Sequence, residues 1–272
     1  MPALLTAAAA AGAAGAGALA WGWFEAGWVR LRTRDCPVAG LPEELEGLRI
    51  AHLSDFHLGM PSRGQAASER AARWAQERRP DLTAITGDLL SRRSGEPRLR
   101  RIVERLPGAY AVLGNHDFAE TRDPFSQEAT VPDLAPAQLL LDEARTTELH
   151  GRRVQVVGVD PRTYARGGSH PERLADPGAD LRILLCHFPS VARRVRPGAF
   201  HLILAGHMHD GQIVLPYPGG KIRFAHPKAT LTDGIYRFGA TTLHVSPGLG
   251  TTFVPFRFFA RPEATELVLQ RG

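Results

Sequence analysis

The sequence predicts an α/β protein, in which a layered domain of strands and helices follows an N-terminal hydrophobic helix. Three observations lead to this prediction. From about residue 48 onwards, short apolar runs alternate with amphipathic or polar stretches, which is the order of elements in layered α/β domains. Several of these runs are apolar throughout, as in sheets covered on both faces. Residues 1–24 contain no charged side chain.

The uncharged N-terminal segment, at about 1.5 Å per residue, is long enough to cross a bilayer as a helix. The residues after it are aromatic and then basic, as at a cytoplasmic membrane interface: Trp21, Trp23, Trp28, Arg30, Arg32 and Arg34. We therefore expect residues 1–30 to anchor the chain in the inner membrane, with the rest on the cytoplasmic face. A processed signal is an alternative, although a positive n-region is missing. A soluble Ala-rich helix is another.

After the anchor, Pro and Gly residues suggest that residues 31–47 are a linker, and residues 48–272 form the expected domain. Strands are predicted at the apolar runs 48–53, 81–86, 108–113, 152–159, 181–186, 201–205 and 241–246. Helices are predicted where apolar residues recur at helical spacing, over residues 64–79, 96–106 and 136–144. The final part, from about Lys221, is expected to be β-rich and hairpin-like.

Composition limits the function only loosely. The formal charge of +5 and the pI near 9.7 are compatible with phosphate-bearing partners or an anionic membrane, and equally with an Arg-rich genome. Two cysteines, Cys36 and Cys186, exclude a disulfide framework and zinc-finger spacing. Cys186 ends an apolar run and is expected to be a buried thiol.

Five of the predicted strands end within about three residues of an Asp, His or Asn. The residues concerned are Asp55, His57, Asp88, Asn115, His116, Asp117, His187, His207 and His209. In open α/β sheets, ligands bind beyond the carboxyl ends of the strands, where loops distant in sequence converge. Imidazoles and carboxylates together suit divalent Mn, Fe or Zn, and one carboxylate, Asp88, could bridge two ions. Gly87, Gly114 and Gly206 each precede a candidate ligand and allow a sharp turn.

Each candidate has an ordinary alternative when taken alone. Asp88 could belong to a turn, Asn115 and Asp117 could cap a helix that begins at Phe118, and His187 could be a core histidine. Five coincidences at strand ends are much harder to explain in this way than one. Five further histidines lack such settings and are interpreted as structural: His150, His170, His201, His226 and His244.

Together these residues resemble the calcineurin-like metallophosphoesterases. The motifs are D-x-H at Asp55, G-D at Gly87, G-N-H-D at Gly114, a single His187 and G-H-x-H at Gly206, in family order over residues 48–212. The ending "DGIYRFGATTLHVSPGLGTTFVPFRFFARPEATELVL" further resembles the membrane-associated bacterial branch of YaeI- and YkuE-type phosphodiesterases. That branch includes relatives that cleave UDP-2,3-diacylglucosamine in lipid A biosynthesis.

The resemblance implies a four-layer sandwich, in which two mixed β-sheets are flanked by helices, and a centre of two divalent metal ions, with manganese first and iron or zinc as alternatives. By the family pattern, one ion is held by Asp55, His57 and His209, the other by Asn115, His187 and His207, and Asp88 bridges them. His116 is implied to face the scissile phosphate, with Asp117 orienting it. One departure is visible, because this branch usually has Gly-Gly where the chain has Asp210-Gly211.

The implied activity is hydrolysis of a phosphodiester or pyrophosphate bond, and the anchor favours a lipid-linked substrate such as UDP-2,3-diacylglucosamine. An extracytoplasmic cell-wall phosphodiesterase, a nuclease and a non-catalytic scaffold are the alternatives. No basic run with interleaved aromatic residues indicates nucleic-acid binding, and no obligate protein partner is evident. Loop cations that could hold a second phosphate are Arg162, Arg166, Lys221, Arg223, Lys228 and Arg237. Phe253, Phe256, Phe258 and Phe259 are expected to pack on the second sheet or to border an acyl-chain groove.

Overall fold

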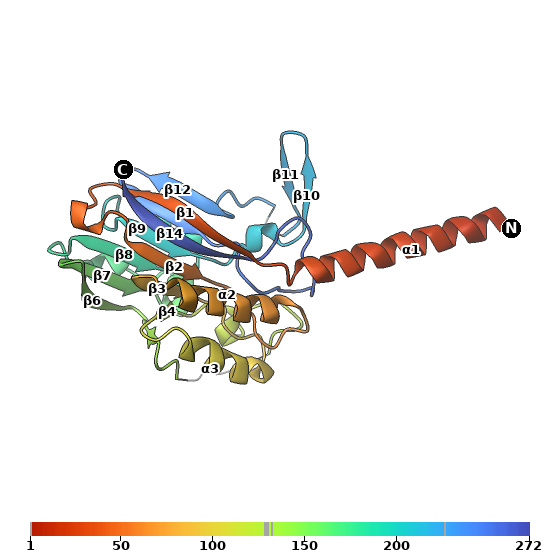
Figure 1. Cartoon of the computed structure of the whole chain (residues 1–272), viewed down its shortest axis with the longest axis horizontal. Helices are drawn as coiled ribbons and strands as arrows, with labels where there is room; N and C mark the ends of the chain where they lie inside the picture. The colour runs from red at the N-terminus through yellow and green to blue at the C-terminus, as the bar shows by residue number, and fades with distance from the viewer. Residues whose placement is uncertain (1, 128–130, 132, 226) are drawn as a thin grey trace.

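Two six-stranded β-sheets lie face to face in the computed structural model, which describes residues 2–127, 131, 133–225 and 227–272. The first sheet has the order β1-β14-β2-β3-β4-β5 and the second the order β12-β13-β9-β8-β7-β6. A separate two-stranded hairpin, β10-β11, stands apart from both (Figure 1). Both large sheets mix parallel and antiparallel pairs, as expected.

The first sheet and the long helices come mainly from the N-terminal half. Their bounds are α1 Pro2–Glu25, β1 Arg30–Val38, β2 Arg49–Leu53, α2 Gly64–Arg78, β3 Leu82–Thr86, α3 Glu96–Glu104, β4 Tyr110–Val112, β5 Gln138–Leu139 and β14 Glu263–Arg271. Short 3₁₀ turns lie between them, at η1 Glu43–Leu45, η2 Arg93–Gly95 and η3 His116–Phe118.

The second sheet and the hairpin are built from the C-terminal half. Their bounds are β6 Glu143–Leu149, β7 Arg152–Gly158, β8 Leu181–Leu185, β9 Leu202–Ala205, β10 Val214–Tyr217, β11 Gly220–Arg223, β12 Gly234–Phe238 and β13 Thr241–Val245. The short helix α4 Pro161–Ala165 and the turns η4 Pro171–Arg173, η5 Pro189–Arg193 and η6 His209–Gly211 complete this half. The β-rich, hairpin-containing final part is thus confirmed.

Three apolar clusters fill the spaces between four layers. Ile50 and Leu267 of the first sheet meet Ile183 and Leu204 of the second in the central cluster. A second cluster packs α2 and α3 against the outer face of the first sheet (Figure 1). A third covers the outer face of the second sheet with α4 and η5, and includes buried Cys186. Helix, sheet, sheet and helix therefore form the four-layer sandwich that the family resemblance implies.

The helix predicted over residues 136–144 is wrong, because this segment contains β5 and the start of β6, which are joined by a bend. Leu139 and Leu141 pack against the cluster beneath α2 and α3, whereas Leu140 lies in the cluster between the sheets. Successive side chains that point to opposite faces have the period of a strand. Because both faces of the sheet are apolar, the three consecutive leucines show no alternation of apolar and polar residues that would have predicted a strand.

The segment 31–47 is not a linker over most of its first half. β1 pairs in parallel with β14 over nine residues, from Arg30↔Glu263 to Val38↔Arg271, and forms the edge of the first sheet. Its exposed Arg and Thr side chains and its Pro37 gave it the composition of a linker. Pro is tolerated at an edge, where one side of the strand lacks a partner.

Helix α1 projects away from the sandwich (Figure 1). Residues Leu5–Glu25 are long and apolar enough to cross a membrane, and only 6% of the segment's 18-residue window is buried. The last turn of α1, by contrast, belongs to the domain. Glu25 is 2% exposed and accepts hydrogen bonds from the Ala260 amide at 2.9 Å and from the Trp21 indole at 3.0 Å.

A pair of buried histidines joins the two sheets. Nδ1 of His52 on β2 lies 2.7 Å from Nδ1 of His244 on β13, and His52 Nε2 lies 2.8 Å from the Thr86 hydroxyl. Burial lowers the pKa of His52 to about 3 and holds the pKa of His244 well below its usual value. Both rings are therefore neutral in the folded protein, and His244 has the structural role expected for it.

This pair should make the fold sensitive to acid. Below the ordinary histidine pKa of about 6.5, the unfolded chain takes up protons that the folded chain excludes, so stability falls as pH decreases towards the folded value. For each such histidine the slope is about 1.4 kcal/mol per pH unit. The free energy of unfolding of His244→Gln, measured by urea titration between pH 7 and 5, should vary less steeply by about this amount. His150→Gln, at an exposed histidine, is the control, and equal slopes for His244→Gln and wild type would refute the prediction.

Candidate metal centre

The carboxyl ends of five strands deliver the candidate side chains to one place. β2, β3 and β4 are parallel neighbours in the first sheet, and β8 and β9 are parallel neighbours in the second. Because parallel neighbours end at the same edge, the loops after them converge. The residues brought together are Asp55, His57, Asp88, Asn115, His116, His187, His207 and His209.

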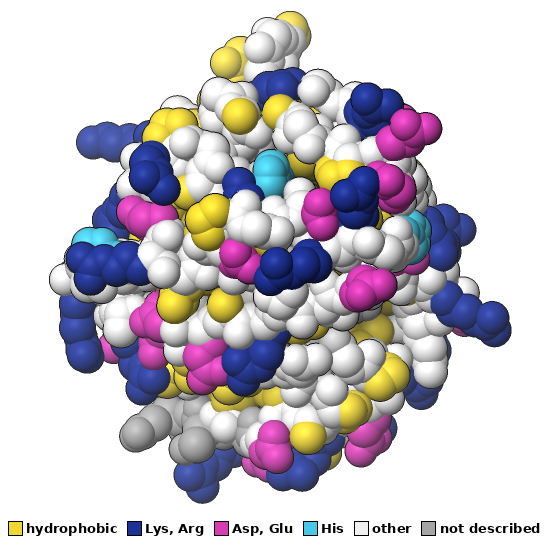
Figure 2. All heavy atoms as spheres, turned by 90° about the vertical axis from the view of Figure 1, so that its left-hand side faces the viewer, with side chains coloured by type: hydrophobic (Ala, Val, Ile, Leu, Met, Phe, Trp, Pro, Cys, Tyr) yellow, Lys and Arg dark blue, Asp and Glu magenta, His cyan; other side chains and the backbone are white. Residues whose placement is uncertain are grey.

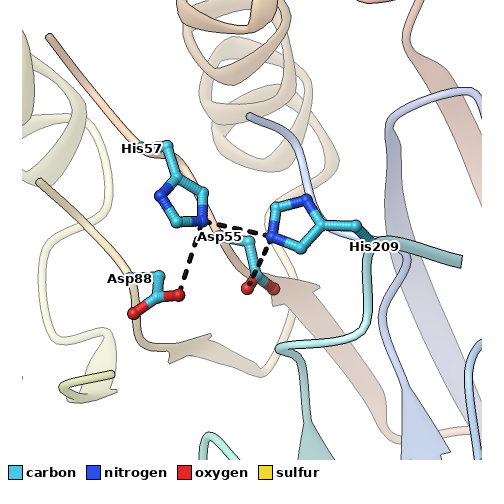
Figure 3. Close-up of side chains that lie close together, drawn as sticks. All are labelled: Asp55, His57, Asp88 and His209. Atoms are coloured by element: carbon cyan, nitrogen blue, oxygen red, sulfur yellow. Dashed lines mark hydrogen bonds and ion pairs between the residues drawn. The ribbon is translucent and has the colours of Figure 1, made fainter. Parts of the chain in front are cut away.

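The first donor group contains Asp55, His57, Asp88 and His209 (Figure 3). All four are buried, and one donor atom from each lies within 4.8 Å of the others. His57 Nε2 lies 3.1 Å from His209 Nε2 and 3.4 Å from Asp88 Oδ2. His209 Nε2 lies 3.4 Å from Asp55 Oδ1.

The second donor group contains Asp88, His187 and His207, whose donor atoms satisfy the same limit. His187 Nε2 lies 3.2 Å from Asp88 Oδ2 and 3.1 Å from His207 Nδ1. The same oxygen of Asp88 therefore faces an imidazole of each group. The backbone amide of His207 also donates to both oxygens of Asp55, at 3.0 and 3.2 Å.

Asn115, which precedes His116 in the loop after β4, carries an unsatisfied acceptor. Its amide nitrogen donates to the Glu120 carbonyl at 3.3 Å, whereas its buried Oδ1 has no hydrogen-bond partner among the described residues. A buried polar atom without a partner is costly and requires an explanation. This oxygen, together with the imidazoles and carboxylates around it, suits divalent transition metals. The alternative role of a helix cap is not taken by its side chain, which makes no capping hydrogen bond.

His116 lies against the first group. Its ring centroid is 4.6 Å from that of His57, and its backbone amide donates to Asp88 Oδ1 at 2.9 Å. Its Nε2 lies 3.2 Å from the Thr121 hydroxyl. Nδ1 is buried and, within the described parts of the chain, makes no hydrogen bond.

The contacts of Asp117 differ from those expected. Its Oδ1 accepts from the amides of Leu89 and Leu90, at 2.8 and 2.9 Å, and its Oδ2 accepts from the Gly114 amide at 2.9 Å. It thus ties the loop after β3 to the loop after β4 instead of orienting the His116 ring. Burial, and the neighbouring charge of Asp88, raise the pKa of Asp117 to about 7.

Burial and neighbouring charges set the protonation of the other groups. Burial alone would raise the pKa of Asp88, but the imidazoles of His187 and His116 hold it well below its usual range. Burial opposes protonation of His187, yet the Asp88 carboxylate raises its pKa to about 9. The pKa of His57 is well below its usual value, because burial and the charge of His116 both disfavour its protonated form. Asp88 is therefore ionised at neutral pH and available to a cation.

Most of the candidate ligand residues have a left-handed backbone conformation. Positive φ values occur at Asp55, His57, Asp88, His207 and His209, between 45° and 74°. Non-glycine residues rarely adopt this conformation, and such strain concentrates at functional sites. Gly87 also has positive φ. Gly114 and Gly206 serve a different purpose, because a Cβ there would overlap Asp88 Oδ1, or Asp55 Oδ2 and Ser54 Oγ.

The sequence did not indicate Arg257, which is fully buried. Its Nη2 donates to His209 Nδ1 at 3.1 Å, and its guanidinium also donates to the carbonyls of Pro247, Gly250 and Ala260. Because a guanidinium only donates, His209 Nδ1 accepts, and the proton of the neutral ring lies on Nε2. A cation that binds Nε2 must displace that proton. A single Arg in an aromatic segment carries no pattern that would reveal this contact.

Asp210, the departure from the family pattern, is also explained. Its carboxylate is 3.0 Å from Lys221 Nζ and 3.0 Å from Arg223, both on the β10-β11 hairpin. Asp210 is therefore paired with two cations, one of which, Arg223, it shares with Asp233. These pairs fix the hairpin to the loop that carries His209.

Of the other loop cations, three make contacts within the protein and one lines a cavity. Arg162 is paired with Asp160 and stacked on Phe118, Arg166 lies 3.9 Å from Glu120, and Arg237 donates to the Gly239 carbonyl. Lys228 instead lines a cavity of about 320 Å³ that also contains His207, Phe188 and Arg193. This cavity opens beside the second donor group and could receive part of a substrate. His226 lies outside the described residues.

The phenylalanines near the C-terminus do not pack on the second sheet as expected. Phe258 lies against Gly22 of α1, and the Phe256 ring is 6.4 Å from that of Trp23. Phe253 and Phe259 are about half exposed, at 48% and 52%. The segment that contains them, residues 253–259, is the surface against which the end of α1 packs; we call it the seat of α1.

Comparison with known proteins agrees with this geometry. The sequence profile of the "Calcineurin-like phosphoesterase" family matches residues 48–211. A zebrafish "Transmembrane protein with metallophosphoesterase domain" is 32% identical, over 88% of this chain and 56% of that protein, so the chain spans little more than half of this relative. Bacillus subtilis YkuE is 28% identical, over 85% and 82% of the two chains. The "UDP-2,3-diacylglucosamine pyrophosphatase LpxG" of Chlamydia muridarum is 25% identical, over 80% and 82%.

The glycines of the donor loops provide a test of the centre. Gly206→Ala should displace Asp55, and Gly114→Ala should displace Asp88, because the added Cβ has no space. Each variant, dialysed after loading with Mn²⁺, should retain less metal than wild type by elemental analysis, by about tenfold or more if supporting contacts act as in other metal sites. Gly168→Ala, where the nearest atom is 3.7 Å away, should retain as much as wild type. Full retention by the first two variants would argue against a metal centre here.

Proposed function

The chain belongs to the calcineurin-like phosphoesterase family of phosphoester hydrolases, and on this premise we propose that it hydrolyses a phosphodiester or pyrophosphate bond of a membrane or envelope lipid precursor. The observation that carries this proposal is the pair of donor groups that share Asp88. Two donor sets joined by one carboxylate suit two cations placed together, as in two-metal hydrolytic sites.

We assign Asp55, His57 and His209 to one cation, Asn115, His187 and His207 to the other, and Asp88 to both. Manganese is our first choice, with iron or zinc as alternatives, because the set mixes imidazoles with oxygen donors and contains no thiolate. The outer contact of His187 favours this assignment. His187 Nδ1 lies 2.8 Å from the Thr86 carbonyl, to which it donates, so Nε2, which faces Asp88, is the atom that would bind a cation once its own proton is displaced.

When bound, two divalent ions neutralise the charge of a phosphoester and acidify the attacking water. The protein's own task is then to hold the ester and to manage its leaving group. His116 is suited to the second role, because its Nδ1 is unsatisfied and its ring lies against His57. A protonated His116 would donate a hydrogen bond to the phosphoryl or leaving oxygen and can pass a proton to it. Asp117 supports this arrangement by tying the backbone that follows Asp88 to that of Gly114, two residues before His116.

Membrane association supports a lipid-linked substrate. α1 is long and apolar enough to cross a bilayer, and the zebrafish relative is named a transmembrane protein. The basic residues that follow α1 favour an inner-membrane anchor with the domain on the cytoplasmic face. That face is where a nucleotide-linked lipid is made, and the name of the chlamydial relative specifies UDP-2,3-diacylglucosamine. We therefore propose this compound as the first substrate to test.

Two substitutions separate metal binding from proton transfer. Asp88→Asn should lose bound metal together with hydrolysis of bis-p-nitrophenyl phosphate, because both donor groups lose their shared carboxylate. His116→Ala should keep its metal, and its kcat should fall by a factor of about 10²–10⁴, the usual contribution of general acid–base catalysis. His150→Ala, at an exposed histidine remote from the donor groups, is the matched control. Wild-type rates in both test variants would overturn the proposed site.

The substrate is tested directly. The Mn-loaded full chain, in detergent micelles with UDP-2,3-diacylglucosamine, should release UMP, which is followed by chromatography. The His116→Ala protein serves as the control for contaminating hydrolases. If the artificial diester is hydrolysed and UMP is not released, the phosphodiesterase assignment stands and this lipid is not the substrate.

A further inference from the structure

The β10-β11 hairpin has two faces of opposite character. Leu215 pairs directly with Ile222 across the strands, and Pro216 pairs with Lys221. Because side chains alternate along a strand, Leu215, Tyr217 and Ile222 share one face. Phe224 joins them, since its amide donates to the Ile213 carbonyl and continues the ladder. Lys221 and Arg223 belong to the other face.

The apolar face is exposed. Leu215, Tyr217, Ile222 and Phe224 are 50%, 52%, 49% and 62% exposed. Contiguous large apolar side chains at a soluble surface mark a contact with a partner or a membrane. The end of the domain opposite α1 has a different character, because charged side chains of both signs cover it and its apolar spots are small and scattered (Figure 2).

The hairpin is fixed to the seat of the membrane helix. The Val214 amide donates to the Phe258 carbonyl at 2.9 Å. The Phe258 ring packs against Gly22 of α1, whose carbonyl accepts from the Arg257 amide at 3.0 Å. In Figure 1 the hairpin stands at the end of the domain from which α1 leaves, and it runs across the direction of α1. A hairpin in this position lies along a membrane that α1 crosses.

The surroundings of the helix base are those of a membrane interface. Trp21, Trp23, Phe24 and Trp28 are each 40–44% exposed, and such rings favour the headgroup level of a bilayer. A basic hollow beside them is lined by Arg30, Arg32, Arg70 and Arg261. Arginines at this level complement the anionic lipids of a cytoplasmic leaflet.

We propose that the apolar face of the β10-β11 hairpin is a second membrane contact, which lies in the bilayer interface beside α1. This inference rests on the membrane anchoring proposed above and adds a surface to it. Asp210 connects the contact to the metal centre, because it binds both cations of the hairpin and lies between His209 and Gly211. Lipid contact thus holds the loop of His209 at the membrane surface, where the headgroup phosphates of a lipid substrate are located.

The experiment measures the depth of the hairpin in a bilayer. Cys36 and Cys186 are buried, so Ile222→Cys can be labelled selectively with an environment-sensitive nitrobenzoxadiazole fluorophore in the full chain. The labelled protein is reconstituted in phosphatidylethanolamine–phosphatidylglycerol vesicles that contain a lipid with a shallow nitroxide. Pro216→Cys, at an exposed position on the opposite face of the same hairpin, is the matched control. Leu215→Cys, which faces Ile222, replaces the test variant if that variant does not fold.

The label at position 222 should shift to the blue and be quenched by the nitroxide lipid, and the label at 216 should show less of both. Equal, water-like emission at the two positions in chains that remain with the vesicles after an alkaline wash would overturn the proposal. The proposal would also be overturned if the emission at position 222 were already fully blue-shifted in detergent and were not quenched by the nitroxide lipid in vesicles. That result would indicate a contact between two copies of the chain. A chain that leaves the vesicles overturns anchoring and docking together. Hydrolysis of bis-p-nitrophenyl phosphate by the same samples tests the metal centre separately.

Discussion

The architecture depends on keeping the carboxylate of Asp88 in contact with two sets of imidazoles in a buried place. Its Oδ2 faces His57 on one side and His187 on the other, and its Oδ1 accepts from the His116 amide. These partners come from both sheets, so the sandwich must align the ends of β2, β3, β4 and β8 within a few ångströms. Buried charges without partners are expensive, and here the partners also give the two sheets a fixed mutual position. The left-handed backbone at the donors and the space left at Gly114 and Gly206 are consequences of the same crowding.

Much of the centre could be predicted from the sequence, because the donors sit where apolar runs end and parallel strands bring such ends together. The family resemblance implies a division of the donors between two ions. The structure gathers the predicted imidazoles and carboxylates in two groups that share Asp88. Contacts made through the backbone or over a long separation could not be predicted. Asp117 bonds to amides, Arg257 reaches His209 from 48 residues away, and neither leaves a repeat or spacing. β1 and residues 136–144 were misassigned for a related reason, because sheet membership depends on partners elsewhere in the chain.

Asp210 shows how a departure from a family pattern can be accommodated. Its φ of 48° lies in the left-handed region, which Asp tolerates better than most residues. Its carboxylate is buried, so the negative charge needs compensation. Lys221 and Arg223 supply that compensation, and they are available because the hairpin turns its polar face towards the loop. The carboxylate of Asp210 therefore holds the hairpin to the loop after β9, and it is not an unpaired negative charge that would repel an anionic substrate.

The contacts at the base of α1 show that its last turn belongs to the folded domain. Gly22 accepts from Arg257, Glu25 accepts from Ala260, and the guanidinium of Arg257 reaches His209. The final turn of α1 is thus part of the cooperative unit that includes the metal-binding loop, although its sequence is that of an anchor. A soluble form of the enzyme made by cutting at the end of the helix would lose these contacts. A truncation that keeps these contacts must therefore begin upstream of Gly22.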